Sequence, residues 1–260
     1  MRYAINTRDP EVARDAREAG FDYVEVQVEN ILHPRESRSA FEDAAAKFRD
    51  AGLPVEAHNV FLSGSLVCVG PEANPGAVEE YAATCFARMA ALGSKVMVFG
   101  SGGARAIPDG WPREKAVEQF VALLSRLGAL AVANGVELVV EPLARTVCNF
   151  VNTVDEGAEL ARASGSPAVG AMADSVHWER NGEGAETIMA AKDKLRHIHV
   201  ATFPNRKVPG AEPWDFGPFL RAVRATGYDG RVTIEAGVDD PAGRVDVLRK
   251  ALSILKRRIP

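Results

Sequence analysis

The sequence of 260 residues is poor in cysteine and has no excess of basic charge, and both shortages limit its function. Its three cysteines, Cys68, Cys85 and Cys148, are widely spaced and odd in number. We therefore predict neither a disulfide framework nor a cysteine-based zinc site. The net charge of -4 leaves no basic excess of the kind that drives binding to nucleic acid, so we expect no nucleic-acid partner.

Long apolar runs are also missing. The N-terminal segment lacks the apolar stretch of a signal peptide, and no later segment reaches the roughly 18 apolar residues of a membrane span. We therefore expect no membrane partner and a cytoplasmic location. The first apolar run is not followed by Gly-x-Gly-x-x-Gly, and no linker rich in proline or glycine divides the chain, which disfavours an open dinucleotide-binding sheet.

A repeated unit is present instead: a short apolar run, a loop, and a longer amphipathic stretch that ends in glycine before the next run. Alternation of this kind predicts parallel strands joined by helices, and eight units in about 250 residues are typical of a closed barrel. We predict an α/β fold, a single (β/α)₈ TIM barrel domain over residues 1–260. The predicted strands are 2–5, 22–26, 54–58, 95–99, 136–140, 168–172, 195–200 and 231–235.

Ionisable residues close four consecutive apolar runs, and in a barrel these ends surround one point. They are Glu141, Asp174, His199 and Glu235. Three carboxylates that met without a cation would repel one another. Together with an imidazole they form a plausible octahedral site for one divalent metal ion, Mn²⁺, Mg²⁺ or Co²⁺, with positions left for water or substrate.

Four runs of sequence, VVEPLARTVCNFVNT, VGAMADSVHW, HIHVATFPNR and TIEAG, resemble the xylose-isomerase-like TIM barrel superfamily, especially its sugar isomerases and ketose 3-epimerases. The resemblance implies that the four strand-end residues bind one metal and that Glu141 and Glu235 also act as acid and base. It implies further that His177 contacts a hydroxyl of a small carbohydrate substrate and that Arg206 holds a substrate oxygen. Since barrels of this superfamily often pair, a homodimer or homotetramer is expected.

The reaction stays open between related chemistries, because epimerisation and aldose–ketose isomerisation both move a proton beside a carbonyl. Many ketose 3-epimerases have a glutamate two positions after the arginine at the end of their fifth strand, whereas Arg145 is followed by Thr146 and Val147. A lyase that eliminates a group beta to a sugar carbonyl, for instance on a 3-keto glycoside, is the main alternative. An endonuclease-IV-like nuclease needs more than five histidines, and a sugar-binding protein without activity would be expected to lose a ligand.

Residues around these strand ends complete the expected pocket. His58 ends the third strand, where it is either a substrate contact or a hydrogen-bonded wall residue. Trp111 is predicted to stack on a sugar face. Arg105 lies in the glycine-rich loop 99–111, where it could bind an anionic substrate group.

Two further residues are expected below the pocket. Glu25 faces inward at the barrel floor, and His197, one pleat below His199, is predicted to hold neighbouring carboxylates rather than the metal.

Overall fold

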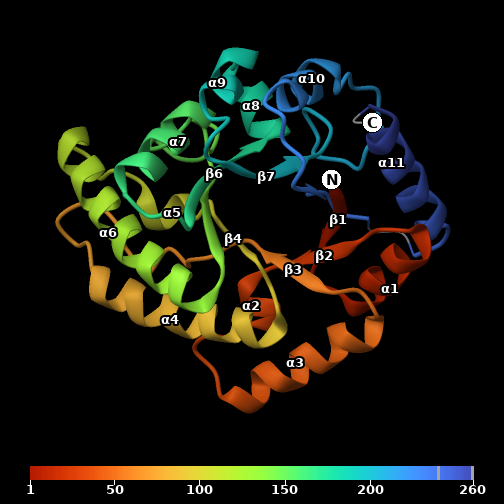
Figure 1. The fold of residues 1–260 in the computed structure, drawn as a ribbon, viewed down its shortest axis with the longest axis horizontal. Helices are drawn as coiled ribbons and strands as arrows, with labels where there is room; N and C mark the ends of the chain where they lie inside the picture. The colour runs from red at the N-terminus through yellow and green to blue at the C-terminus, as the bar shows by residue number, and fades with distance from the viewer. Residues whose placement is uncertain (239–240, 259–260) are drawn as a thin grey trace.

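The computed structural model describes residues 1–238 and 241–258, in which eight parallel strands close into a barrel. The strands pair in chain order, and β1 also pairs with β8, which confirms the predicted TIM barrel (Figure 1). They are β1 (Arg2–Thr7), β2 (Tyr23–Val26), β3 (Val55–His58), β4 (Val96–Phe99), β5 (Glu137–Val140), β6 (Val169–Asp174), β7 (Leu195–Val200) and β8 (Arg231–Ile234). Each predicted strand agrees with the observed one to within two residues.

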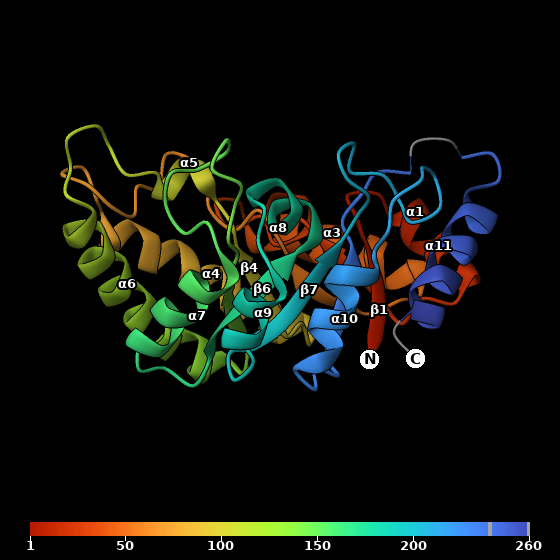
Figure 2. The same ribbon diagram turned by 90° about the horizontal axis from the view of Figure 1, so that it is seen from above.

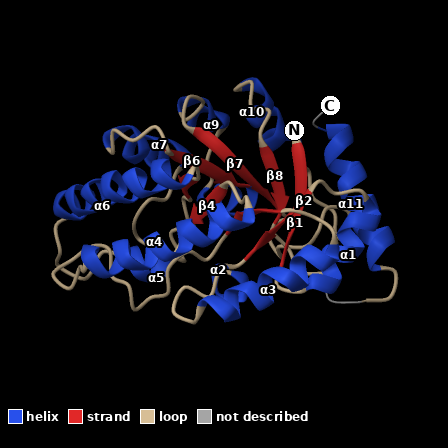
Figure 3. Ribbon diagram, turned by 60° about the horizontal axis from the view of Figure 1, so that its bottom comes forward, coloured by secondary structure: helices blue, strands red, loops and turns tan. Residues whose placement is uncertain are grey.

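Helices surround this barrel as an outer layer (Figure 3). They are α1 (Pro10–Ala19), α2 (Val28–Ile31), α3 (Arg38–Ala51), α4 (Pro75–Leu92), α5 (Gly102–Arg105), α6 (Arg113–Asn134), α7 (Val154–Ala163), α8 (Ser175–Asn181), α9 (Ala185–Ala190), α10 (Gly217–Ala225) and α11 (Arg244–Arg258). Glycines end several of these helices, as predicted. Gly20 caps α1 at φ +93° and Gly135 caps α6 at φ +64°, a left-handed conformation in which glycine has no Cβ to clash.

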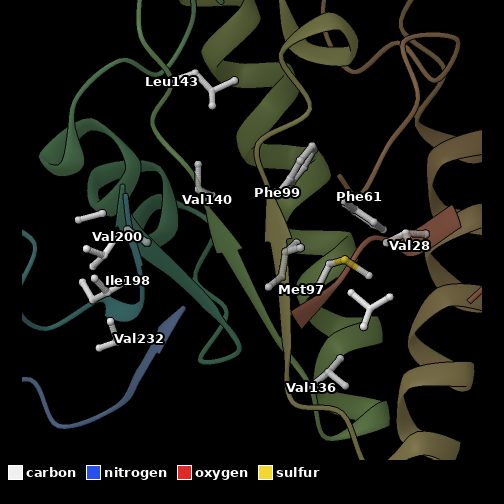
Figure 4. Packing of buried hydrophobic residues seen from close by; sticks show 14 of the residues in the cluster. Val28, Phe61, Met97, Phe99, Val136, Val140, Leu143, Ile198, Val200 and Val232 are labelled. Atoms are coloured by element: carbon white, nitrogen blue, oxygen red, sulfur yellow. The ribbon is translucent and has the colours of Figure 1, made fainter. Parts of the chain in front are cut away.

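Side chains on each strand alternate between two cores. One set fills the inside of the barrel and consists of Ala4, Tyr23, Ala57, Val96, Val98, Val139 and Met172. The alternate strand residues, such as Met97, Phe99 and Ile198, pack outward against the helices (Figure 4). This regular alternation decides which side chain at each strand end faces the barrel axis.

Helix α6 is long and apolar enough, by length and composition alone, to cross a membrane, although the sequence was not expected to contain such a segment. Its apolar residues have partners within the fold. Phe120 packs between Phe99 of β4 and Phe150, with ring centroids 5.2 and 5.4 Å away, and Leu124 and Leu127 are fully buried. Packing against the barrel therefore accounts for the apolar composition of the buried face of α6.

The carboxyl ends of the strands, and the loops that follow them, lie at one face of the barrel (Figure 2). Barrels of this architecture carry their binding sites at that face because eight loops converge there.

Candidate active site

Four ionisable side chains meet at the carboxyl-end face. Glu141 follows β5, Asp174 ends β6, His199 lies in β7 and Glu235 follows β8. One ligand atom from each lies within 4.8 Å of the others. His199 Nδ1 is 3.5 Å from Glu235 Oε2, 3.8 Å from Glu141 Oε1 and 3.9 Å from Asp174 Oδ2. The structure therefore brings the four predicted ligands together.

Strand alternation explains why these residues converge. Val139 and Met172 fill the barrel interior, so Glu141 and Asp174, each two positions later, point to the same side above them. His199 stands in the same relation to His197. The site is therefore the uppermost inward layer of the barrel, where charged groups replace apolar ones.

The two carboxylate oxygens of Asp174 have different partners. Oδ1 accepts the backbone N–H groups of Val176 at 2.7 Å and His177 at 2.9 Å, which caps the N-terminus of α8. Oδ2 faces His199 and Arg206. The start of α8 thus fixes the orientation of the oxygen that Asp174 presents to the site.

Glu25 forms the floor beneath His199, as the sequence indicates, and it is completely buried. Its carboxylate lies 2.8 Å from His197 Nε2 and 2.9 Å from His199 Nε2. Thr233 donates its hydroxyl to the same carboxylate at 3.0 Å, and Tyr23 in turn hydrogen-bonds Thr233 at 3.0 Å. The carboxylate orients both rings, so His197 has the supporting position that was predicted for it.

The proton of His199 follows from this contact. A carboxylate can only accept, so Nε2 of His199 carries a hydrogen toward Glu25. Nδ1 points to the three other carboxylates and has no hydrogen-bond partner within the described residues, although it is buried. A buried acceptor nitrogen beside three carboxylates is unfavourable unless a proton or a cation occupies the space between them.

Arg206 supplies positive charge from the loop after β7. Its Nη1 donates to Asp174 Oδ2 at 3.1 Å and to Glu235 Oε2, and its own backbone has a φ of +50°. A left-handed φ at a non-glycine residue costs on the order of 1–3 kcal/mol, so the contacts around it must hold it in place. The local backbone therefore directs this guanidinium over the carboxylates.

The pKa values reflect this concentration of charge. Burial, together with the neighbouring Glu235 carboxylate, raises the pKa of Glu141 to about 8. Burial also opposes ionisation of Asp174, but Arg206 outweighs it and holds the pKa of Asp174 below its ordinary value. For His199 burial favours the neutral ring, yet the surrounding carboxylates, Glu25 first, raise its pKa well above the usual value.

A cavity of about 380 Å³ opens above these groups. It is lined by Asn6, Gln27, Glu141, Leu143, His177, Arg206, Glu235, Ala236 and Gly237. Two of the predicted substrate contacts lie in its wall, where His177 Nε2 is 3.2 Å from Arg206 Nη2. His177 Nδ1 accepts the Ala144 N–H at 3.1 Å, so the neutral ring carries its hydrogen on Nε2. Two donors therefore face each other, and an oxygen atom of a ligand could accept from both.

Three other predicted substrate contacts, His58, Arg105 and Trp111, do not line this cavity. His58 is fully buried, and its ring nitrogens lie 3.0 Å from Val26 O and 2.9 Å from Ser94 Oγ. Its neighbour Ala57 faces the barrel interior, so the His58 ring points to the other side of the sheet. Burial lowers its pKa to about 4, as expected for a neutral packing histidine.

Arg105 is also fully buried and cannot meet an anion in the cavity. Its guanidinium donates to Glu141 O at 2.6 Å and to Phe99 O at 3.3 Å, so it joins the ends of β5 and β4. Trp111 packs partly buried against the helical core with Lys115 over its ring, and it does not line the cavity.

Several site residues were missed by the sequence reasoning. Asn59 donates to Glu235 Oε1 at 2.9 Å, and Asn6 and Gln27 line the cavity. Gly100 is needed for space, because a Cβ there would lie 2.1 Å from Glu141 Oε2. All four residues follow an inward-facing strand residue by two positions, so counting the alternation in every strand would have found them.

The donor set fits a hard divalent cation. Three carboxylates and one imidazole nitrogen suit Mn²⁺, Mg²⁺ or Co²⁺, and the unpartnered His199 Nδ1 is the atom such an ion would require. Glu25, His197 and His199 form a second close group, but Nε2 of each histidine already contacts the Glu25 carboxylate.

Comparison with known proteins gives a family match over most of the chain. The family model described as Xylose isomerase-like TIM barrel matches residues 13–258. A probable ketose 3-epimerase of Synechocystis sp. is 33% identical over 108 residues, which cover 40% of this chain and 37% of that protein. An L-ribulose 3-epimerase of Methylomonas sp. is 30% identical over 118 residues, covering 45% and 41%. The alignments thus span about two fifths of either relative.

Solved structures extend the likeness to the complete fold. A D-psicose 3-epimerase crystallised in the presence of D-fructose superposes with a TM-score of 0.85 at 20% sequence identity. The superposition covers 100% of this chain and 99% of that chain. At this identity the likeness describes the barrel, while the chemistry depends on the residues of the site.

Proposed function

We propose that this chain, which belongs to the xylose isomerase-like TIM barrel family, is a divalent-metal-dependent sugar isomerase or epimerase. The observation that carries the proposal is the convergence of Glu141, Asp174, His199 and Glu235 beneath one cavity. The partial matches to ketose 3-epimerases favour epimerisation of a ketose within this class. Such an enzyme moves a proton beside the substrate carbonyl.

In this proposal the four side chains hold one Mn²⁺, Mg²⁺ or Co²⁺ ion. The bound cation would supply electrostatic stabilisation of the negative charge that develops on the substrate when a carbon-bound proton leaves. Glu25 prepares the site for it, because its contact with His199 Nε2 keeps the Nδ1 lone pair directed at the carboxylates.

Glu141 and Glu235 are the proposed acid and base, since both carboxylates line the cavity. One removes the proton beside the carbonyl and the other returns a proton to the opposite face, which inverts the carbon. If the proton returns to the neighbouring carbon, the result is isomerisation. Without the ion, burial and the Glu235 carboxylate raise the pKa of Glu141 to about 8, so binding of the ion, which requires the ionised carboxylate, releases a proton from Glu141.

His177 and Arg206 are the proposed substrate-binding pair. An oxygen atom of the substrate can accept from His177 Nε2 and Arg206 Nη2, which are 3.2 Å apart in the cavity wall. Arg206 already contacts Glu235 and Asp174, so a substrate oxygen held by it would lie next to the reacting carboxylates. This contact would place the reacting carbon between acid and base.

The first experiment measures the metal. Purified protein is analysed for bound ions, stripped with chelator, and titrated with Mn²⁺, Mg²⁺ and Co²⁺ while thermal stability is followed. The wild type is expected to gain stability with added ion, whereas Glu141→Gln and Glu235→Gln are expected to lose most of that gain. Equal responses in all three proteins would contradict the four-ligand site.

The second experiment identifies the reaction. Metal-loaded protein is incubated in deuterated water with ketoses, aldoses, inosose-type cyclitols and 3-keto glycosides. Deuterium at the carbon beside the carbonyl, with an epimer or isomer as product, is the expected result. Loss of a substituent beta to the carbonyl would identify a lyase instead, and absence of exchange on every sugar would contradict the proposal.

Two properties beyond the site belong to the same proposal. The three free cysteines are buried, which is consistent with the cytoplasmic location that we propose. We also propose a homodimer or homotetramer on the basis of the family resemblance, and light scattering coupled to gel filtration tests it.

A further inference from the structure

We propose that a second cavity, adjoining the one above the four ionisable residues, binds a sugar ring attached to the substrate. The preferred substrate is then a glycosylated keto sugar rather than a free monosaccharide. This inference rests on the proposed function and specifies its substrate class. We refer to the cavity over Glu141 and Glu235 as the reacting cavity and to its neighbour as the outer cavity.

The two cavities lie side by side. The outer cavity has a volume of about 470 Å³, and the reacting cavity about 380 Å³. Four residues line both cavities and form the boundary between them: Asn6, Gln27, Ala236 and Gly237. The outer cavity extends from this boundary over the ends of β1 and β8 to the first turns of α1 and α11.

The lining of the outer cavity suits a hydroxyl-rich ring. Arg8 and Asp9 are exposed and offer donors and an acceptor side by side, while Val12 provides an apolar surface. Arg244 is only 6% exposed and donates through Nη1 to Asp15 at 2.9 Å. This ion pair holds Arg244 as a fixed part of the cavity wall.

Size and charge favour a ring over a phosphate group. A phosphate would occupy only a small part of about 470 Å³, whereas cavities of several hundred Å³ are typical of sites for whole small molecules. Asp9 balances Arg8 at the rim and Arg244 is paired with Asp15, so the lining offers an anion no net positive charge. The predicted anion contact, Arg105, is buried on the other side of the site and offers no alternative phosphate position.

The position of the attached ring follows from the reaction. When C2 and C3 of a ketose lie over Glu141 and Glu235, the end of the chain at C6 is the one most distant from the reacting carbons. That end can pass the boundary formed by Asn6 and Gln27 and reach the outer cavity. A ring on O6 is therefore expected to bind there.

Three matched sugars test the inference by calorimetry on Mn²⁺-saturated protein: D-fructose, D-fructose 6-phosphate, and isomaltulose, which is D-fructose with a glucose ring on O6. Isomaltulose is expected to bind at least about tenfold more tightly than D-fructose. Equal affinity for these two sugars, or tightest binding of D-fructose 6-phosphate, would overturn the inference.

The substitution Val12→Trp fills the outer cavity without touching the reacting residues. It is expected to remove the advantage of isomaltulose and to leave D-fructose binding within about twofold. Val132→Trp, at a 53% exposed helical position outside both cavities, is the matched control and should change neither affinity. Arg8→Ala is a milder second variant that should weaken isomaltulose alone, by about threefold. Equal weakening of both sugars by Val12→Trp and Arg8→Ala would contradict the outer site.

Deuterium exchange separates this inference from the proposed function. If isomaltulose binds preferentially and exchanges deuterium faster than D-fructose, both are supported. If it binds preferentially in a manner that depends on Val12, and no sugar exchanges deuterium, the proposed reaction is wrong while the outer site is supported. If both sugars exchange deuterium equally well and bind equally well, the reaction is supported and the outer site is wrong.

Discussion

Glu25 lies directly beneath His199, with its Oε1 2.9 Å from His199 Nε2 and both side chains completely buried. A buried carboxylate in this position does two things. It fixes which ring nitrogen carries hydrogen, and it prevents rotation of the ring away from Glu141, Asp174 and Glu235.

The change Glu25→Gln should therefore weaken metal binding without removing any ligand. An uncharged amide orients the His199 ring less strongly, and loss of such supporting contacts typically lowers metal affinity by about 10–100-fold. Calorimetric titration with Mn²⁺ measures the effect. Glu18→Gln, at an exposed position on α1, is the control and should bind as the wild type does. Unchanged affinity in Glu25→Gln would show that strand packing alone holds the ring.

Gly100→Ala should disable the site while the barrel stays folded. The added Cβ would lie 2.1 Å from Glu141 Oε2, so the carboxylate must move from its place among the other ligands. We expect a loss of Mn²⁺ affinity of at least about tenfold, with a melting temperature close to that of the wild type. In Gly103→Ala the nearest atom to the new Cβ is 3.7 Å away, an ordinary contact, and this control should bind metal normally. A normal affinity in both variants would contradict the steric argument.

The raised pKa of Glu141 predicts a dependence of stability on pH in chelator-treated protein. The native state keeps a proton on this carboxyl up to a pKa of about 8, whereas the unfolded chain releases it near pH 4.3. The native state therefore binds more protons between these values, and this contribution to stability falls as pH rises through the window. The variant Glu141→Gln has no titratable group at this position and serves as the reference.

Urea unfolding at pH 5 and pH 8 measures this difference. The free energy of unfolding of the wild type, relative to that of Glu141→Gln, should decrease by on the order of 3–4 kcal/mol between the two pH values. Identical pH profiles for the two proteins would show that Glu141 is ionised throughout. Metal affinity should rise over the same window, because binding requires the ionised carboxylate.

The packing of α6 predicts a large loss of stability for Phe120→Ala. The ring is fully buried between Phe99 and Phe150, and truncation of a buried phenylalanine typically costs about 3–5 kcal/mol. Val132→Ala, on the exposed face of the same helix, should cost less than about 1 kcal/mol. Equilibrium unfolding in urea compares the two variants. Similar small losses would indicate that α6 contributes little to the core.

The barrel was predictable because its signals are local: each strand is a short apolar run, and a glycine such as Gly20 or Gly135 ends the preceding helix. The residues Glu141 and Asp174 were predictable for the same reason, since each closes such a run. His58 also ends a run, yet its side chain points toward the helices. Neighbouring residues of a strand point to opposite sides, and Ala57 already faces the barrel interior.

The partners of several residues, in contrast, depend on which distant segments meet, and no local pattern encodes those contacts. Arg105 joins β4 to β5 through backbone carbonyls, and Asn59 reaches Glu235 across 176 residues of sequence. Gly100 likewise leaves space for Glu141 only because β4 pairs with β5. Such features follow from the closed barrel rather than from any single segment.

The shared carboxylate of Asp174 makes the backbone amides of Val176 and His177 natural spectroscopic reporters. Both amides donate to Oδ1 while Oδ2 faces the other ionisable groups, so any charge placed among those groups polarises the two N–H bonds through a single carboxylate. Their amide resonances and hydrogen-exchange rates should therefore change together as the site is filled. Occupancy could then be followed residue by residue in solution, without a substrate and without a substitution in the site.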